Sequence, residues 1–151
     1  MILSSGWDNT LKIYDVEKGY PIASIGGINV SRDSIDVLGD MCLTGSYRNE
    51  NEISLISIKN EKVIFTFDYI RRNQDQTYPE NGYILGARFS SCGNFLLAGG
   101  AGKNELRVWI NNCDTSQSFK QVMHIGPMGF PVVALDTSKA DNKVAVALSN
   151  G

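Results

Sequence analysis

The sequence predicts an all-β fold built from repeated units of short strands. Apolar and polar residues alternate at period two in stretches such as Leu11–Tyr14 and Leu106–Trp109, which is typical of strands with one buried face. No stretch of ten or more residues shows convincing helical periodicity. The 15 glycines against 4 prolines indicate many tight turns. Together these observations favour antiparallel sheets over helices.

Four segments share one order of features: a short strand of small and apolar residues, a polar turn, and then an alternating strand. The small-residue strands are expected at 2–6, 41–46, 95–100 and 144–151. Leu43 follows Leu3 by 40 residues, Leu97 follows Leu43 by 54, and Ala145 follows Leu97 by 48. A base period of about 40–45 residues with loop insertions is typical of β-propeller repeats.

The other strands are predicted from apolar runs that lie between turn residues. In chain order they are expected at 11–16, 22–25, 34–37, 53–58, 63–67, 84–89, 106–110, 121–125 and 132–135. The turns contain residues that tolerate a positive φ angle in tight hairpins. These turns are Asp8-Asn9, Lys18-Gly19, Lys59–Glu61, Ser91–Asn94, Gly102–Asn104 and Asn150-Gly151.

Composition excludes several classes of protein. A formal net charge of -2 leaves no basic field over a whole face that would recruit a nucleic-acid backbone. No apolar run approaches the roughly 18 residues of a membrane span, and the N-terminus does not resemble a signal peptide. Cys42, Cys92 and Cys113 do not make a disulfide framework, so an intracellular, reducing compartment is expected.

Two stretches carry a resemblance to a known family. Residues 4–15, SSGWDNTLKIYD, resemble a WD40 repeat in which Tyr-Asp stands where Trp-Asp is usual. Residues 87–100, ARFSSCGNFLLAGG, are similar to the stretch of that family usually written AFSPDGKLLASGG, and Val108-Trp109 closes the same unit. The resemblance covers essentially the whole chain and implies four-stranded blades of a WD40-type β-propeller.

The resemblance also implies that the propeller is incomplete. The motifs place strands b to d of one blade at 1–26, full blades at 27–68 and 83–126, and strands a and b of a fourth at 130–151, with an insertion loop at 68–82. Known propellers close with about four to eight blades. We therefore expect about three blades' worth of a longer propeller, with further blades from the same or another chain. A small self-standing β domain, including an enzyme, is the alternative.

Many WD40 blades carry a hydrogen-bonded tetrad of Asp, Ser or Thr, Trp and His, which satisfies buried polar groups. Ser4, Asp8 and Tyr14 fall at matching positions in the first blade, and Trp109 matches in the third. The tetrad of the third blade is expected to be absent, because Lys103 and Gly99 occupy its Asp and Ser positions. These matching residues are predicted to be structural.

The sequence carries no recognisable catalytic or metal-binding constellation. His124 is the single histidine and lies in an apolar strand, where it is expected to be a packed or edge residue rather than a catalytic base. The cysteines and His124 lack zinc-ligand spacing. The segment 99–103 lacks the full phosphate-loop pattern. Acidic side chains in polar turns are expected to be solvated: Glu50, Glu52, Asp75 and Glu80. No enzyme activity, cofactor or metal is predicted.

Partner contacts are expected on the connections between blades. In the insertion 68–82, the candidates are Tyr69, Arg71, Arg72 and Tyr78, because Tyr and Arg are enriched at binding hot spots. On the next connection, 127–131, the candidates are Met128 and Phe130. An RNA-binding alternative would use Arg71 and Arg72 with stacking tyrosines, but the neighbouring acids disfavour it.

The sequence therefore predicts a non-enzymatic scaffold that binds other proteins, as a peptide or a subunit, at a propeller rim. An RNA-associated scaffold in a ribonucleoprotein complex is the second hypothesis. The segments 34–40 and 43–48 also resemble large WD40 proteins of ciliated protists. That resemblance implies a cytoplasmic, cytoskeletal or ciliary location.

Overall fold

The fold was determined from a computed structural model that describes residues 1–48, 50–69, 82–111, 119–140 and 142–151. These described residues contain thirteen strands and no helix, which confirms the all-β prediction. The strands are β1 (Ile2–Ser5), β2 (Thr10–Asp15), β3 (Tyr20–Gly26), β4 (Ile35–Leu38), β5 (Met41–Gly45), β6 (Ile53–Ser57), β7 (Lys62–Phe67), β8 (Tyr83–Phe89), β9 (Phe95–Ala101), β10 (Leu106–Ile110), β11 (Gln121–Ile125), β12 (Val132–Thr137) and β13 (Val144–Leu148).

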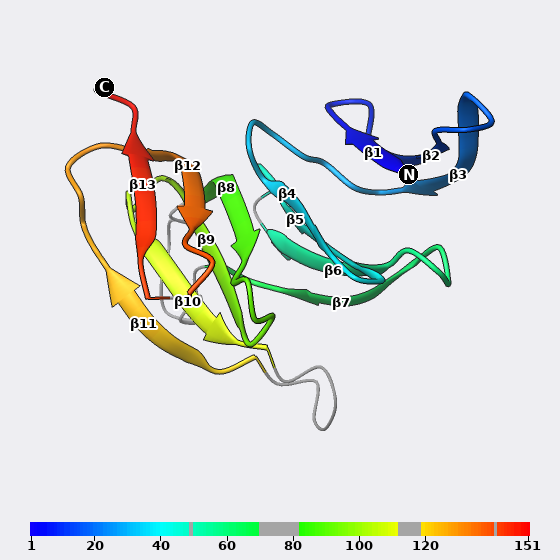
Figure 1. Cartoon of the computed structure of the whole chain (residues 1–151). Coiled ribbons are helices and arrows are strands. Elements are labelled where there is room, and N and C mark those ends of the chain that lie inside the picture. Colours follow the sequence, from blue (N-terminus) through cyan, green and yellow to red (C-terminus); the bar gives the residue numbers. More distant parts are fainter. Residues whose placement is uncertain (49, 70–81, 112–118, 141) are drawn as a thin grey trace.

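The strands form antiparallel sheets in chain order. The first sheet is β1-β2-β3, the second β4-β5-β6-β7, the third β8-β9-β10-β11, and the fourth β12-β13. Figure 1 shows the sheets following one another, with β8 of the third sheet lying between β4 of the second and β12 of the fourth. The two complete sheets confirm the predicted four-stranded antiparallel blades, and their neighbours contain three and two strands in the described chain. The architecture is that of a partial β-propeller.

The turns have the backbone geometry that their residue types require. Among the predicted turn residues, positive φ angles occur at Asn9 (61°), Gly19 (74°), Glu61 (53°), Gly93 (77°), Gly102 (97°), Asn104 (55°) and Gly151 (89°). Asn and Gly tolerate this region best, because Asn can bond locally and Gly has no Cβ. Short turns with these residues allow successive strands to pair antiparallel.

The core consists of apolar layers between successive sheets. Between the first and second sheets lies a cluster that includes Leu11, Ile13, Ile28, Val30, Cys42 and Ile56. Between the second and third lie Leu43, Leu55, Ile84, Phe89, Leu96 and Trp109 among others. A third cluster joins Leu97, Leu106, Val108, Val132 and Leu135. Burying one such side chain contributes roughly 1.5–3 kcal/mol. The layers therefore dominate the stability of the stack.

Polar contacts join the inner strands of the second and third sheets. The Asp33 amide donates to the Leu85 carbonyl at 3.1 Å, and the Ala87 amide donates to the Asp33 carbonyl at 3.2 Å. The Arg88 guanidinium pairs with the Asp33 carboxylate at 2.5 Å. The Phe89 amide donates to Asp36 at 2.8 Å. These bonds hold β8, the inner strand of the third sheet, against β4 of the second sheet and the residues just before it.

Close packing at Gly45 makes one test of this interface. A Cβ on Gly45 would lie 2.1 Å from the Cγ2 atom of Ile84, a fully buried side chain of the third sheet. The Gly45→Ala variant is therefore expected to lower the free energy of unfolding by about 1–3 kcal/mol, because the well-packed layer must shift. Gly6→Ala is the control, since nothing lies within 4 Å of its Cβ position. Urea denaturation measures both variants, and equal stabilities would contradict the packing described.

Candidate protein-interaction site

The predicted contact residues divide between described and undescribed parts of the chain. Arg71, Arg72 and Tyr78 lie outside the described residues. Tyr69, Met128 and Phe130 are described. All three lie at one edge of the sheets, which we call the rim edge (residues 68–69, 102–105 and 126–131). The register Leu106↔Ile125 places the turn 102–105 beside the start of the connection 126–131.

Tyr69 is a core residue, which corrects its prediction as an exposed contact. Its side chain is 1% exposed and packs in the layer between the second and third sheets, with its ring centroid 6.2 Å from that of Trp109. Its hydroxyl donates to the Glu105 carbonyl at 2.5 Å, and burial raises its pKa. The protonated phenol thus remains a donor. Tyr69 anchors the root of the 68–82 connection in the third sheet.

An ionic network around the largely buried Glu105 and Arg107 side chains surrounds this anchor. Arg107 donates from Nε and Nη2 to one oxygen of Glu105 at 3.0 and 2.7 Å. His124 Nε2 lies 3.1 Å from the other oxygen of Glu105. Arg107 Nη1 donates to the Tyr69 carbonyl at 2.9 Å, and its guanidinium carbon lies 5.2 Å from the centroid of the Tyr69 ring. The network joins the second sheet to the third at the rim edge.

Electrostatics keep the central carboxylate ionised. Glu105 is 6% exposed, and this burial opposes its charge, but the hydrogen bonds and charge of Arg107, followed by those of His124, hold its pKa below the ordinary value. Glu52 is a second buried carboxylate, 1% exposed, and accepts the Tyr69 amide at 3.0 Å. The expectation that Glu52 is a solvated turn residue was wrong, because it bonds the chain at the root of the connection.

Sequence reasoning missed Glu105 and Arg107 as a pair. Their spacing of two residues places both side chains on one face of an extended segment, and β10 pairs Arg107 with His124 on β11. This spacing was the available signal. What could not be read from the sequence is that Tyr69, 36 residues earlier, closes the network.

On the second connection, 126–131, one of the two candidate side chains is exposed and the other is partly buried. Phe130 is 47% exposed, as expected of a contact residue. Met128 is half-buried and packs against the cluster between the third and fourth sheets, while its amide donates to the Asn104 carbonyl at 2.9 Å. A Cβ on Gly126 would lie 2.7 Å from the Cγ atom of Glu105. The connection thus rests on the same turn as Tyr69.

The tetrad-like residues do not form a tetrad in the described structure. Asp8 is exposed and accepts from the Thr10 amide at 3.2 Å and from the Thr10 hydroxyl at 2.8 Å. These two hydrogen bonds lower the pKa of Asp8. Partial desolvation opposes this effect, and the charge of Lys12 adds to it. Within the described residues, no hydrogen bond joins Asp8 to Ser4 or Tyr14. Trp109 is 4% exposed and packs edge-on against Phe67 at 5.4 Å. Asp8 and Trp109 therefore have local turn and packing contacts.

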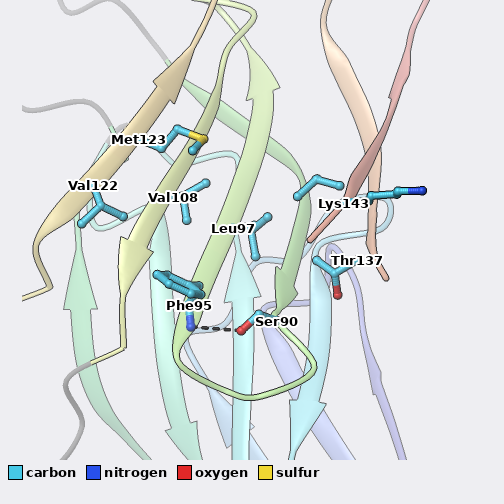
Figure 2. Close-up of a pocket in the computed structure, with 9 residues that line it drawn as sticks. Ser90, Phe95, Leu97, Val108, Val122, Met123, Thr137 and Lys143 are labelled. Atoms are coloured by element: carbon cyan, nitrogen blue, oxygen red, sulfur yellow. Dashed lines mark hydrogen bonds between the residues drawn. The ribbon is translucent and has the colours of Figure 1, made fainter. Parts of the chain in front are cut away.

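A separate apolar groove lies between the third and fourth sheets. Figure 2 shows side chains of β9, β10 and β11, among them Leu97, Val108 and Met123, facing the same space as Thr137 and Lys143. At its base the Phe95 amide donates to the Ser90 hydroxyl at 3.1 Å. The lining is mainly apolar and carries no cluster of acids or bases suited to catalysis.

Two further features bear on chemistry and location. In the described part of the chain, no three His, Cys, Asp or Glu side chains are grouped to hold a metal ion; Cys113 lies outside it. Cys42 is fully buried, and burial, with the nearby Asp36 charge, raises the pKa of its thiol to about 12. The described residues also contain no helix long and apolar enough to span a membrane.

Comparisons with known proteins identify the fold and no closer relationship. No protein-family model matches the sequence, and no curated protein matches it. A chain in the crystal structure of a mitotic checkpoint complex is similar, with a TM-score of 0.74 and 16% sequence identity. The match covers 98% of this chain and 42% of that chain, so this chain spans less than half of its length. The chain has the fold of a WD40-like β-propeller segment.

The network predicts a pH-dependent stability. Because the pKa of Glu105 is lowered in the folded state, its contribution is present above the ordinary Glu pKa of about 4.3 and is lost as pH falls through the folded value. At pH 7 the Glu105→Gln variant is expected to be about 1–3 kcal/mol less stable than the wild type. Denaturant unfolding between pH 7 and pH 3 should show this difference shrinking at acidic pH. A difference that stays constant would contradict the role of the carboxylate charge.

Proposed function

We propose that the chain is a non-enzymatic protein-interaction scaffold, a WD40-type propeller segment that acts within a multiprotein assembly. The observation that carries the proposal is the construction of the rim edge. The roots of two consecutive connections are fixed on one turn, 102–105, through Tyr69 and Met128. Beside this fixed base, Phe130 exposes an apolar ring to solvent.

The proposed site comprises Phe130 with Arg71, Arg72 and Tyr78 on the 68–82 connection. Arginine and aromatic side chains are enriched at binding hot spots, and a fixed base reduces the ordering that binding requires. The similar solved chain belongs to a multiprotein complex, which agrees with a scaffold role. WD40 family membership, completion by further blades, and the intracellular, cytoskeletal or ciliary location are parts of the same proposal.

The test is co-purification of a defined partner with the tagged chain from its source cells. Replacing Arg71, Arg72, Tyr78 and Phe130 together by alanine is expected to weaken the association at least about tenfold, because hot-spot truncations each cost about 1–4 kcal/mol. Quantitative mass spectrometry followed by a binding isotherm with the purified partner measures the loss.

Lys59→Ala is the matched control. Lys59 is an exposed cation on the turn before β7, whereas the 68–82 connection follows β7, so the two positions lie at opposite ends of that strand. The control should bind like the wild type. Unchanged binding by the fourfold variant would contradict the site, and loss of the partner on ribonuclease treatment would favour the RNA-associated hypothesis instead.

A further inference from the structure

The turns after β1 and β5 bring exposed aromatic and cationic side chains together where the first and second sheets meet. Trp7, in the β1–β2 turn, is 80% exposed, more than any other large apolar side chain of the described residues. Its ring centroid lies 6.0 Å from that of Tyr47, in the β5–β6 turn, with 54° between the ring planes. Arg48 follows Tyr47 and is exposed. These three residues are named here the junction patch.

A buried amide holds two members of the junction patch. Asn29 lies on the connection between β3 and β4 and is 5% exposed. In the orientation that satisfies its hydrogen bonds, its side-chain nitrogen donates to the Tyr47 hydroxyl at 3.2 Å. Its side-chain oxygen accepts from Arg48 Nη2 at 2.7 Å and also from Arg48 Nε. Because a buried amide without partners is costly, Asn29 fixes the positions of the tyrosine ring and the guanidinium group.

Backbone hydrogen bonds hold the two turns in place beneath the patch. The Asn9 carbonyl, at the end of the first turn, accepts from the Gly27 amide at 2.8 Å. In the second turn, the Ser46 amide donates to the Glu52 carbonyl at 2.7 Å, and the Ser46 carbonyl accepts from the Ile84 amide at 3.0 Å. The patch therefore rests on a bonded base, which reduces the ordering that a ligand must impose.

The uncompensated charge of the patch is positive and lies at Arg48. Asp8 is the carboxylate next to Trp7, but it lies 3.7 Å from Lys12 Nζ and accepts from the Thr10 hydroxyl at 2.8 Å. No carboxylate of the described residues forms an ion pair with Arg48. A carboxylate on a ligand would complement this charge, because the planar guanidinium group matches the geometry of a carboxylate.

We propose that the junction patch binds a peptide segment in which a carboxylate lies close to an aromatic side chain. The carboxylate pairs with Arg48, and the aromatic side chain packs on the exposed indole of Trp7. Tyr47 contacts Trp7 and precedes Arg48, so the two anchors of the ligand lie close together. Tryptophan, tyrosine and arginine are the side chains most enriched at binding hot spots. The inference rests on the proposed scaffold role and adds a second surface, with a defined ligand chemistry, to it.

Charge favours a peptide over a nucleic acid as the ligand. The junction patch has one arginine, the carboxylate of Asp8 lies beside Trp7, and the chain has a formal net charge of -2. Nucleic-acid binding depends on several cations that neutralise a continuous phosphate backbone, whereas a peptide can present a single carboxylate to Arg48.

Three synthetic peptides test this chemistry. Acetyl-Asp-Phe-Asp-Phe-amide carries both anchors, acetyl-Asn-Phe-Asn-Phe-amide lacks the charge, and acetyl-Asp-Ala-Asp-Ala-amide lacks the rings. In NMR spectra of the isotopically labelled 151-residue chain, the first peptide is expected to shift the Trp7 indole N–H signal and the backbone amide signals of Tyr47 and Arg48. The indole signal of Trp109, which is 4% exposed, should not move. The other two peptides should bind at least about tenfold more weakly, because each lacks one anchor.

Variants of the chain with matched controls locate the surface. Arg48→Gln and Trp7→Ala should each weaken binding of the first peptide about tenfold, followed by the amide signals of the β5–β6 turn. Lys62→Gln and Tyr20→Ala remove an exposed cation and a 55% exposed ring where β7 and β3 begin, at the opposite edge of the sheets, and should bind normally. All four side chains are exposed, so the variants are expected to fold, and urea denaturation verifies this.

Four results would overturn the proposal. They are equal binding by the peptides with and without the carboxylates, normal binding by Arg48→Gln, an unmoved Trp7 signal at millimolar peptide, and tighter binding of a short oligouridylate than of the first peptide. The last result would identify a nucleic acid as the ligand. Phe130→Ala, a variant of the rim edge, should bind the peptide normally, so failure of this inference can be distinguished from failure of the proposed function.

Discussion

The structure depends on the requirement that each sheet bury two apolar faces, because a sheet in this stack has no thick core of its own. Strand β5 shows the constraint most directly. Cys42 and Leu43 are adjacent, so they point to opposite faces, and they are 0% and 1% exposed in different clusters. The second sheet is therefore stable only between two neighbours. The third sheet is subject to the same requirement, although part of its apolar face toward the fourth sheet is exposed.

The third sheet lacks the tetrad that many WD40 blades carry and has a different polar network at its rim edge. Lys103 and Gly99 stand where an Asp and a Ser would be needed, and Trp109 packs among aromatic rings. Interlocking bonds among Tyr69, Glu105, Arg107 and His124 hold this edge of the sheet. A buried carboxylate is costly unless it is paired and hydrogen-bonded. Here both oxygens of Glu105 have cationic or histidine partners, so the buried charge links sheets instead of opposing their association.

The sequence was sufficient for the strands and turns because these depend on local signals. Alternation in Leu106–Trp109 and turn residues such as Asn104 and Gly93 predicted the hairpins that the structure contains. Tyr69 and Glu52 were misjudged because their burial depends on contacts 36 and 17 residues away in the chain. Both residues have polar neighbours in the sequence, which is typical of exposed loops. Local periodicity cannot report which loop root enters a neighbouring sheet, whereas the alternation that it does report is imposed by the strand itself.

The turn 102–105 explains how a stack of sheets can present a defined rim. The Glu105 carbonyl holds Tyr69 from the preceding connection, while the Asn104 carbonyl holds the Met128 amide of the following one. The Glu105 side chain also packs against Gly126, where a Cβ would come within 2.7 Å. Two connections separated by a whole sheet therefore share one anchor of four residues. Because their roots cannot move independently without breaking buried bonds, a partner that touches both meets a preset spacing. Preorganisation of this kind reduces the entropy lost on binding, which would favour the rim binding proposed above.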